Sequence, residues 1–254
     1  MKIVIAMDSF KGSLTSTQAG DAAAKGILRV YPNAEIMISP LADGGEGTTN
    51  ALVSGLNGTY KTITVADPLG RPIQAQYGIL PNQTAVIEMA AASGLPLLSE
   101  RERNPMYTIT YGFGEMIHDA IRNGCRNFIL GIGGSATNDG GIGCLQALGF
   151  NLLDKNGKPV SYGAKGLSEL AAISDINVIP ELKECIFHIA CDVRNPLCGE
   201  NGCSNVFAPQ KGADKLMIAQ MDAYLQHYVE LTKAYHTKSN PDYPGVGAAG
   251  GLVL

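Results

Sequence analysis

Residues 128–143 read FILGIGGSATNDGGIG, which is the strongest single signal in the sequence. The apolar run 128–130 is typical of a strand, and residues 142–148 have a helical pattern. The loop between them is dense in glycine, which suits a nest of backbone N–H groups around phosphate oxygens at a helix start. A long turn without a ligand is the alternative, but glycine costs order unless something requires it. The stretch therefore predicts a strand, an anion-binding loop and a helix.

The same order of elements opens the chain. Residues 2–7 form a nearly all-apolar run, typical of a strand covered on both faces. Thr15 and Gln18 have capping-box spacing at the start of a helix. A second strand at 35–39 leads through a glycine-rich turn into another helix. This β-α-β-α order predicts an α/β fold with a doubly wound beginning.

Bulk composition excludes several classes of protein. The 254 residues are 45% hydrophobic and 17% charged, as in a packed globular protein. A formal charge of −4 argues against nucleic-acid or anionic-membrane partners. No apolar stretch approaches the ~20 residues that span a bilayer. The six cysteines contain no C-x-x-C pair, so we expect reduced thiols in a cytoplasmic protein.

Two polar loops follow the first two strands. The first, residues 8–13, combines the carboxylate of Asp8, the hydroxyl of Ser9 and the ammonium group of Lys11. An ordinary loop with a solvated lysine is the alternative. The second, residues 42–48, sets Asp43 and Glu46 among glycines, so that backbone can approach a ligand while a carboxylate holds a cation. A glycine-rich turn with incidental charge is its alternative.

A further polar segment follows a strand predicted at residues 185–191, which we expect to be buried. Asp192 ends this strand, where a carboxylate can take a proton from a hydroxyl group. Asn195 and Lys211 can orient or neutralise phosphate oxygens. The alternative for Asp192 is a structural cap of the turn at Pro196.

One competing interpretation is a nicotinamide-dependent oxidoreductase. Gly131, Gly133 and Ala136 match a version of the dinucleotide fingerprint. The nearest suitable acidic residue, Asp154, falls in a predicted Asn-Gly hairpin, which weakens this interpretation. A Walker A sequence is absent, and the histidines have neither metal-ligand spacing nor a partner for a catalytic triad.

Six segments occur in an order that resembles the type I glycerate kinase family over the whole chain. They are Asp8-Ser-Phe-Lys-Gly-Ser, Ala42-Asp-Gly-Gly-Glu-Gly-Thr, Gly133-Gly-Ser-Ala-Thr-Asn-Asp-Gly-Gly, Asp192-Val-x-Asn-Pro-Leu, Phe207-x-Pro-Gln-Lys-Gly-Ala and Gly247-Ala-Ala-Gly-Gly. The resemblance implies transfer of the γ-phosphoryl group of ATP to D-glycerate with Mg2+. It also implies an interrupted Rossmann-like three-layer domain, its first half at residues 1–66, and an inserted mixed α/β domain at residues 67–254.

In the mechanism that we expect, Asp192 is the general base, and Lys11 and Lys211 counter phosphate charge. Asp43 or Asp139 contacts Mg2+, and the base and metal roles could be exchanged. The substrate- or phosphate-binding candidates are Asp8, Ser9, Gly44, Gly45, Gly133, Gly134, Ser135, Asn138 and Asn195. The loop at residues 133–141 could hold either phosphate groups or the glycerate carboxylate, because both are compact anions.

The resemblance departs from the family pattern after Gly247-Ala-Ala-Gly-Gly, where members continue with a Gly-Glu-Gly-Arg segment and further strands. We therefore expect the inserted domain to be incomplete at its C-terminal end. A catalytically inactive fragment is the alternative function, with activity near background and a tendency to self-associate. A homo-oligomer is also possible. Glycerate and a nucleotide are the expected partners.

Overall fold

The computed structural model describes residues 1–10, 13–235 and 239–254. Its strands are β1 (Lys2–Met7), β2 (Glu35–Pro40), β3 (Thr59–Ala66), β4 (Pro72–Ile79), β5 (Thr84–Glu88), β6 (Asn127–Gly131), β7 (Asn151–Leu153), β8 (Ala172–Ser174) and β9 (Ile186–Ala190). Its α-helices are α1 (Ser16–Val30), α2 (Thr48–Gly55), α3 (Ala90–Ser93), α4 (Tyr111–Arg122), α5 (Ile142–Ala147), α6 (Ala164–Leu167), α7 (Cys203–Phe207) and α8 (Lys215–Tyr235). Short 3-10 helices lie at Leu95–Leu97, Glu100–Glu102, Pro180–Glu184, Pro209–Lys211 and Ala248–Gly250.

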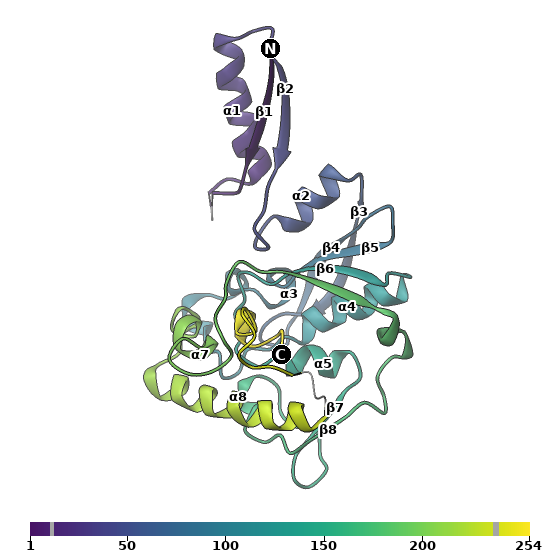
Figure 1. The fold of residues 1–254 in the computed structure, drawn as a ribbon, viewed down its shortest axis with the longest axis vertical. Helices are drawn as coiled ribbons and strands as arrows, with labels where there is room; N and C mark the ends of the chain where they lie inside the picture. Colours follow the sequence, from purple (N-terminus) through teal and green to yellow (C-terminus); the bar gives the residue numbers. More distant parts are fainter. Residues whose placement is uncertain (11–12, 236–238) are drawn as a thin grey trace.

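The N-terminal unit consists of β1, α1 and β2 and projects from the rest of the molecule (Figure 1). The two strands pair in parallel, and the predicted capping box of Thr15 and Gln18 begins α1. Gly20 lets α1 lie close to β2, because a Cβ there would come 2.5 Å from Ile38 Cγ2. On the other face of the pair, Val4 and Met37 are 58% and 60% exposed. The expectation that β1 is covered on both faces is therefore wrong, because α1 covers one face.

A five-stranded sheet forms the centre of the larger part, in the order β3-β4-β5-β6-β9. The strands β5, β6 and β9 run in parallel, whereas β3, β4 and β5 pair antiparallel. On one face, α4 buries Phe113 against Tyr77 and Phe128. On the other face, Val53 of α2 packs against Val86 of β5. The predicted α/β class is confirmed.

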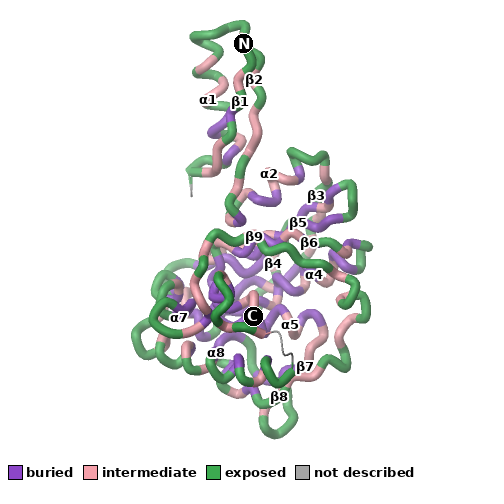
Figure 2. Tube along the Cα trace, viewed as in Figure 1, coloured by how far each residue is buried: buried purple, intermediate pink, exposed green. Residues whose placement is uncertain are grey.

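Burial is concentrated around this sheet, whereas the N-terminal unit has few buried residues (Figure 2). The edge strand β9 is an exception, since Ile186 is 56% exposed and Ile189 is 37% exposed. The prediction of a buried strand here is wrong, because in the described chain β9 has a neighbour on only one side, β6.

A second hydrophobic cluster joins α5, α7 and α8, with Leu197 and Leu225 fully buried.

The expected domain division after residue 66 stays a prediction. The pairing of β3 with β4 crosses that point over the whole length of β3. Glu115 of α4 also accepts a hydrogen bond from the backbone N–H of Ala66 at 2.8 Å.

No helix among the described residues combines the length and the apolarity needed to cross a bilayer.

The close packing of α4 against β3 generates a testable prediction about stability. A Cβ at Gly112 would lie 1.9 Å from the carbonyl oxygen of Ala66, so Gly112→Ala must displace backbone. We expect the free energy of unfolding to fall by about 1–3 kcal/mol, as in overpacked cores. The matched variant Gly26→Ala, in α1, meets nothing within 4 Å and should stabilise its helix by about 0.5–1 kcal/mol. Urea denaturation measures both, and an unchanged Gly112→Ala midpoint would contradict this packing.

Candidate active site

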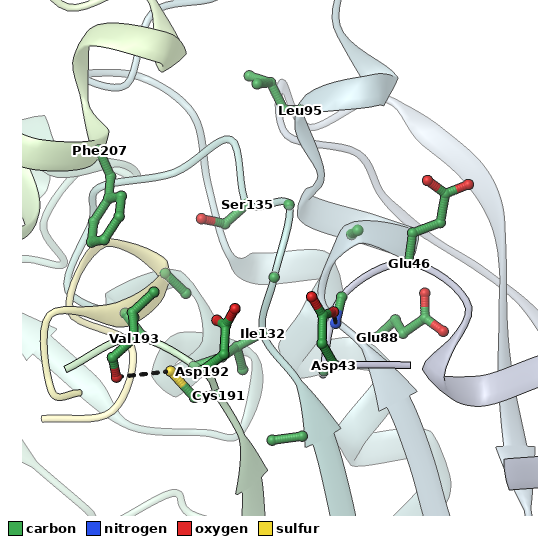
Figure 3. A pocket seen from close by; sticks show the side chains of 18 of the residues that line it. Asp43, Glu46, Glu88, Leu95, Ile132, Ser135, Cys191, Asp192, Val193 and Phe207 are labelled. Atoms are coloured by element: carbon green, nitrogen blue, oxygen red, sulfur yellow. Dashed lines mark hydrogen bonds between the residues drawn. The ribbon is translucent and has the colours of Figure 1, made fainter. Parts of the chain in front are cut away.

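A cavity of about 820 Å3 lies where the loops after several strands converge (Figure 3). Its walls come from the loops that follow β1, β2, β5, β6 and β9, together with α7, the 3-10 helix Pro209–Lys211 and residues 248–249. Ligands of open α/β sheets bind at the carboxyl ends of strands, where connecting loops meet. The position of the cavity therefore makes it the candidate active site.

Glycine allows three segments of the cavity wall to touch. The backbone N–H of Gly133 donates to the carbonyl oxygen of Gly44 at 3.2 Å. A Cβ at Gly133 would lie 2.8 Å from the Cα of Gly45, and one at Gly44 would lie 2.5 Å from the carbonyl oxygen of Ala190. Any side chain at these positions would push the loops after β2, β6 and β9 apart. These glycines therefore form part of the cavity wall because backbone must approach backbone.

The glycine-rich loop after β6 divides into two parts. Gly133, Gly134 and Ser135 line the cavity. Asn138 and Asp139 are fully buried and do not line it. The Nδ2 group of Asn138 donates to the hydroxyl oxygen of Ser204 at 2.9 Å. The second part of the loop is thus turned into the protein.

Asp139 is held by donors from two neighbouring elements. Its carboxylate accepts hydrogen bonds from the N–H and hydroxyl groups of Thr110, at 3.0 and 2.8 Å. It also accepts from the N–H groups of Gly141 and Gly143, at 3.0 and 3.4 Å, around the start of α5. Burial raises the pKa of Asp139, and these donors oppose that effect. The arrangement joins the start of α4 to the start of α5.

Lys211 brings a buried positive charge to the cavity. It is 2% exposed, and its Nζ donates to Ser135 Oγ at 2.9 Å and to the carbonyl oxygen of Thr137 at 2.6 Å. It makes no ion pair with any described residue. Burial lowers the pKa of Lys211 to about 8, because the charged form loses hydration. A buried cation without a carboxylate partner, next to a hydroxyl group, can receive a small anion.

The cavity walls are otherwise acidic. Asp8, Asp43, Glu46, Glu88 and Asp192 all line them. Asp43 Oδ1 accepts from the N–H of Gly45 at 3.0 Å, and Asp8 Oδ1 accepts from the N–H of Ser9 at 2.6 Å. In Figure 3, Asp43 and Asp192 lie on either side of the chain that carries Ile132. The described residues contain no group of three or more His, Cys, Asp or Glu that could hold a metal ion by themselves.

Glu88 is the lining carboxylate that the sequence analysis missed. It ends β5, and its carboxylate accepts from the N–H of Thr49 at 2.6 Å and from that of Gly47 at 3.3 Å. Burial raises the pKa of Glu88, and the negative charge of Glu46 adds to the effect. Its place after the apolar run 85–87 was the available signal, since the other acidic candidates also follow strands.

Most residues predicted for the site meet in the cavity. Those that line it are Asp8, Ser9, Asp43, Gly44, Gly45, Gly133, Gly134, Ser135, Asp192 and Lys211. Those that do not are Asn138, Asp139 and Asn195. Asn195 holds a turn, since its Nδ2 donates to the carbonyl oxygen of Asn201 at 2.8 Å and its own carbonyl accepts from Gly247 N–H. Lys11 lies outside the described residues, and the roles of the others stay predictions.

Several known proteins are similar to this chain in sequence or in structure. Glycerate 2-kinase of Escherichia coli (strain K12) is 46% identical over 253 residues, which cover 99% of this chain and 66% of that protein. Glycerate kinase of Halalkalibacterium halodurans is 48% identical over 251 residues, which cover 98% of this chain and 66% of that protein. A crystal structure assigned as glycerate kinase 2 from Salmonella typhimurium LT2 superposes with a TM-score of 0.91 at 44% identity, with 100% of this chain and 68% of that chain covered.

The chain thus spans about two thirds of the length of the curated relatives that it matches. A sequence model described as the glycerate kinase family matches residues 3–254, which include every loop of the cavity. The chain belongs to the glycerate kinase family.

Proposed function

We propose that this protein is a glycerate kinase, which transfers the γ-phosphoryl group of ATP to D-glycerate and releases phosphoglycerate and ADP. The observation that carries the proposal is the cavity that Lys211 and Ser135 line together with five carboxylates. Its position at the carboxyl ends of parallel strands, in a chain of the glycerate kinase family, supports the same conclusion.

The part of the cavity around Lys211 suits an anion. Lys211 contributes a positive charge, Ser135 contributes a hydroxyl group, and the exposed backbone of Gly134 lies in the same wall. A point charge beside backbone N–H groups is a common arrangement for phosphate or carboxylate oxygens. Both substrates of the proposed reaction carry such groups.

The acidic side of the cavity suits a divalent cation that accompanies the nucleotide. Five carboxylates line the described walls, against the single lysine Lys211, so a triphosphate would be repelled without a counterion. Mg2+ prefers oxygen ligands and is usually bound by one or two carboxylates, substrate phosphates and water. The absence of a cluster of three ligands among the described residues agrees with that kind of site. Bound there, Mg2+ would neutralise charge on the phosphate oxygens.

Asp43 is the better candidate for contact with Mg2+ than Asp139. Asp43 lines the cavity, and among the described residues the donor to its Oδ1 is the N–H of Gly45. Asp139 is fully buried and accepts hydrogen bonds from four donors. A metal ion would have to displace these donors, which join α4 to α5.

We assign the role of general base to Asp192. It follows β9, is exposed within the cavity and has no hydrogen bond to a described protein group. Its carboxylate would accept the proton of the attacking glycerate hydroxyl group. The bond between that oxygen and the γ-phosphorus then forms, while the bond from the γ-phosphorus to the bridging oxygen of ADP breaks.

The oxidoreductase interpretation needs Asp154 to bind the ribose of a nicotinamide cofactor, and the position of Asp154 does not support that role. The carboxylate of Asp154 accepts from the N–H groups of Asn156 and Lys158, both at 2.8 Å, in an exposed turn. Asp154 does not line the cavity. The part of the glycine-rich loop that does line it, residues 133–135, lies next to Lys211, because the Nζ of Lys211 donates to Ser135 Oγ, and this suits an anion.

A coupled assay for ADP tests the proposed function. We expect ADP release that requires D-glycerate together with Mg2+ and ATP, and that stops when EDTA removes the metal ion. Titration with a reduced nicotinamide cofactor should leave its fluorescence unchanged. Quenched cofactor fluorescence, together with no glycerate-dependent ADP release, would overturn the proposal.

Replacement of the proposed base should act on turnover more than on stability. We expect Asp192→Asn to lower kcat by ~100- to 10,000-fold, because general-base catalysis contributes on that order. The melting temperature should stay within about a degree or two, since an exposed side chain is changed. The matched variant Asp214→Asn removes a carboxylate that caps α8 outside the cavity. A kcat of Asp192→Asn within a few-fold of that control would remove Asp192 from this role.

Lys211 should weaken the folded state while it strengthens anion binding. Between its folded pKa of about 8 and its ordinary value of 10.5, the unfolded chain binds the additional proton. The contribution of Lys211 to the free energy of unfolding therefore rises with pH through this window. Affinity for an anion at Lys211 should fall in the same window, because the ammonium group loses its charge.

The variant Lys211→Met tests this combination. Calorimetric titrations with ADP and with glycerate should show at least one affinity reduced by about 10-fold or more, consistent with loss of a charged hydrogen bond. The decrease in affinity above about pH 8 should also disappear. Lys165→Met, which changes an exposed lysine near Ser168, is the control. If both affinities equal those of the control while the melting temperature falls, Lys211 is structural only.

A further inference from the structure

Glu88 occupies the wall between two cavities. It lines the large cavity and also a second one of about 270 Å3, which is bordered by Gly47, Thr49, Asn50, Tyr60 and Gln76. In Figure 3, Glu88 lies beside Asp43 and below Glu46. It comes from the central sheet, whereas Asp43 and Glu46 come from the loop that links β2 to α2. Glu88 is thus where the sheet meets that loop.

The start of α2 depends on Glu88 for its hydrogen bonds. The N-cap residue Gly47 has φ +95° and no side chain, so it cannot cap the helix itself. The first N–H groups of a helix have no partner inside the helix. Glu88 supplies one, because its two oxygens accept from the N–H groups of Gly47 and Thr49. A carboxylate at this end is also favoured by the helix dipole.

The same contacts fix the loop before α2. The hydroxyl group of Thr48 donates to the carbonyl oxygen of Gly45 at 2.9 Å, which ties the loop to the first turn of the helix. Asp43 in turn accepts from the N–H of Gly45. A chain of hydrogen bonds therefore leads from Glu88, through the start of α2, to the carboxylate that we propose for contact with Mg2+.

We propose that Glu88 is a positioning residue, which anchors the loop at residues 43–47 so that Asp43 meets the cation carried by the nucleotide. The part that concerns the cation rests on the proposed function. Glu88 acts through the loop and not on the reacting atoms. Both carboxylate oxygens of Glu88 are needed as acceptors. Glutamine would keep one acceptor oxygen and turn an NH2 group toward an N–H donor.

The variant Glu88→Gln tests the proposal, with Asp154→Asn as its control. Asp154 is matched, because it too accepts hydrogen bonds from two backbone N–H groups in a loop, but it lies outside both cavities. Hydrogen exchange measured by NMR reports the N–H groups of Gly47 and Thr49 directly. We expect their exchange to become about 10- to 100-fold faster in Glu88→Gln, as for loss of a hydrogen bond to a charged group. The control should leave it unchanged.

Calorimetric binding of ADP, with and without Mg2+, is the second measurement. We expect Glu88→Gln to weaken Mg2+-dependent ADP binding about 10-fold or more, and metal-free ADP binding no more than about 3-fold. A purely structural role would change both affinities alike, as would general destabilisation. Unchanged exchange at Gly47 and Thr49 overturns the proposal, and so does an equal loss of both affinities.

These measurements separate the proposal from the proposed function, because neither requires turnover. A protein that binds ADP with Mg2+ but does not phosphorylate glycerate would contradict the function and leave the role of Glu88 standing on its own measurements. If the unaltered protein does not bind ADP, the function fails, and hydrogen exchange alone decides whether Glu88 anchors the loop.

Discussion

The candidate site depends on the contact between the backbones at Gly133 and Gly44. This contact joins the loop after β6, in the central sheet, to the loop after β2, in the N-terminal unit. A Cβ at Gly133 would overlap the backbone of Gly45, and a Cβ at Gly44 would overlap the backbone of Ala190 at the end of β9. The cavity has its present shape because the backbones of three segments are in contact. Lys211 and the carboxylates line one cavity only because the segments that carry them meet there.

The hydrogen bonds of each polar group separate residues that support the site from residues that can bind a ligand. Asp139 has four protein donors around its carboxylate, so its requirements are met without a ligand. Lys211 is also buried, and its Nζ donates to one hydroxyl group and one carbonyl oxygen. Among the described residues, the negative charge of Asp139 acts on it only from beyond ion-pair distance. The lowered pKa of Lys211 corresponds to a cost on the order of 3 kcal/mol for keeping its charged form buried. A bound anion would offset that cost, which is why we assign ligand binding to Lys211.

The sequence predicted the α/β class and most of the cavity, because both leave local signals. Apolar runs that end in polar, glycine-containing loops identify strand ends, and strand ends are where the cavity lies. Asn138 and Asp139 belong to the same glycine-rich motif as Ser135, and the pattern alone could not tell which side chains turn inward. Their orientation depends on Thr110 and Ser204, which are distant in the sequence. Glu88 was missed since its partners, Gly47 and Thr49, lie about forty residues earlier in the chain.

The two sides of the cavity differ in how firmly the fold holds them. Lys211 and Ser135 are themselves buried in the larger part, whereas Asp8 and Asp43 follow strands of a unit in which Ile5 is the only buried strand residue among those described. A small core gives that unit little rigidity of its own. The position of its loops therefore rests on contacts with the central sheet, through Gly133 to Gly44 and through Glu88 to the start of α2. Phosphoryl transfer needs the two substrates aligned with each other. It would then depend on these few contacts as much as on the charged groups themselves.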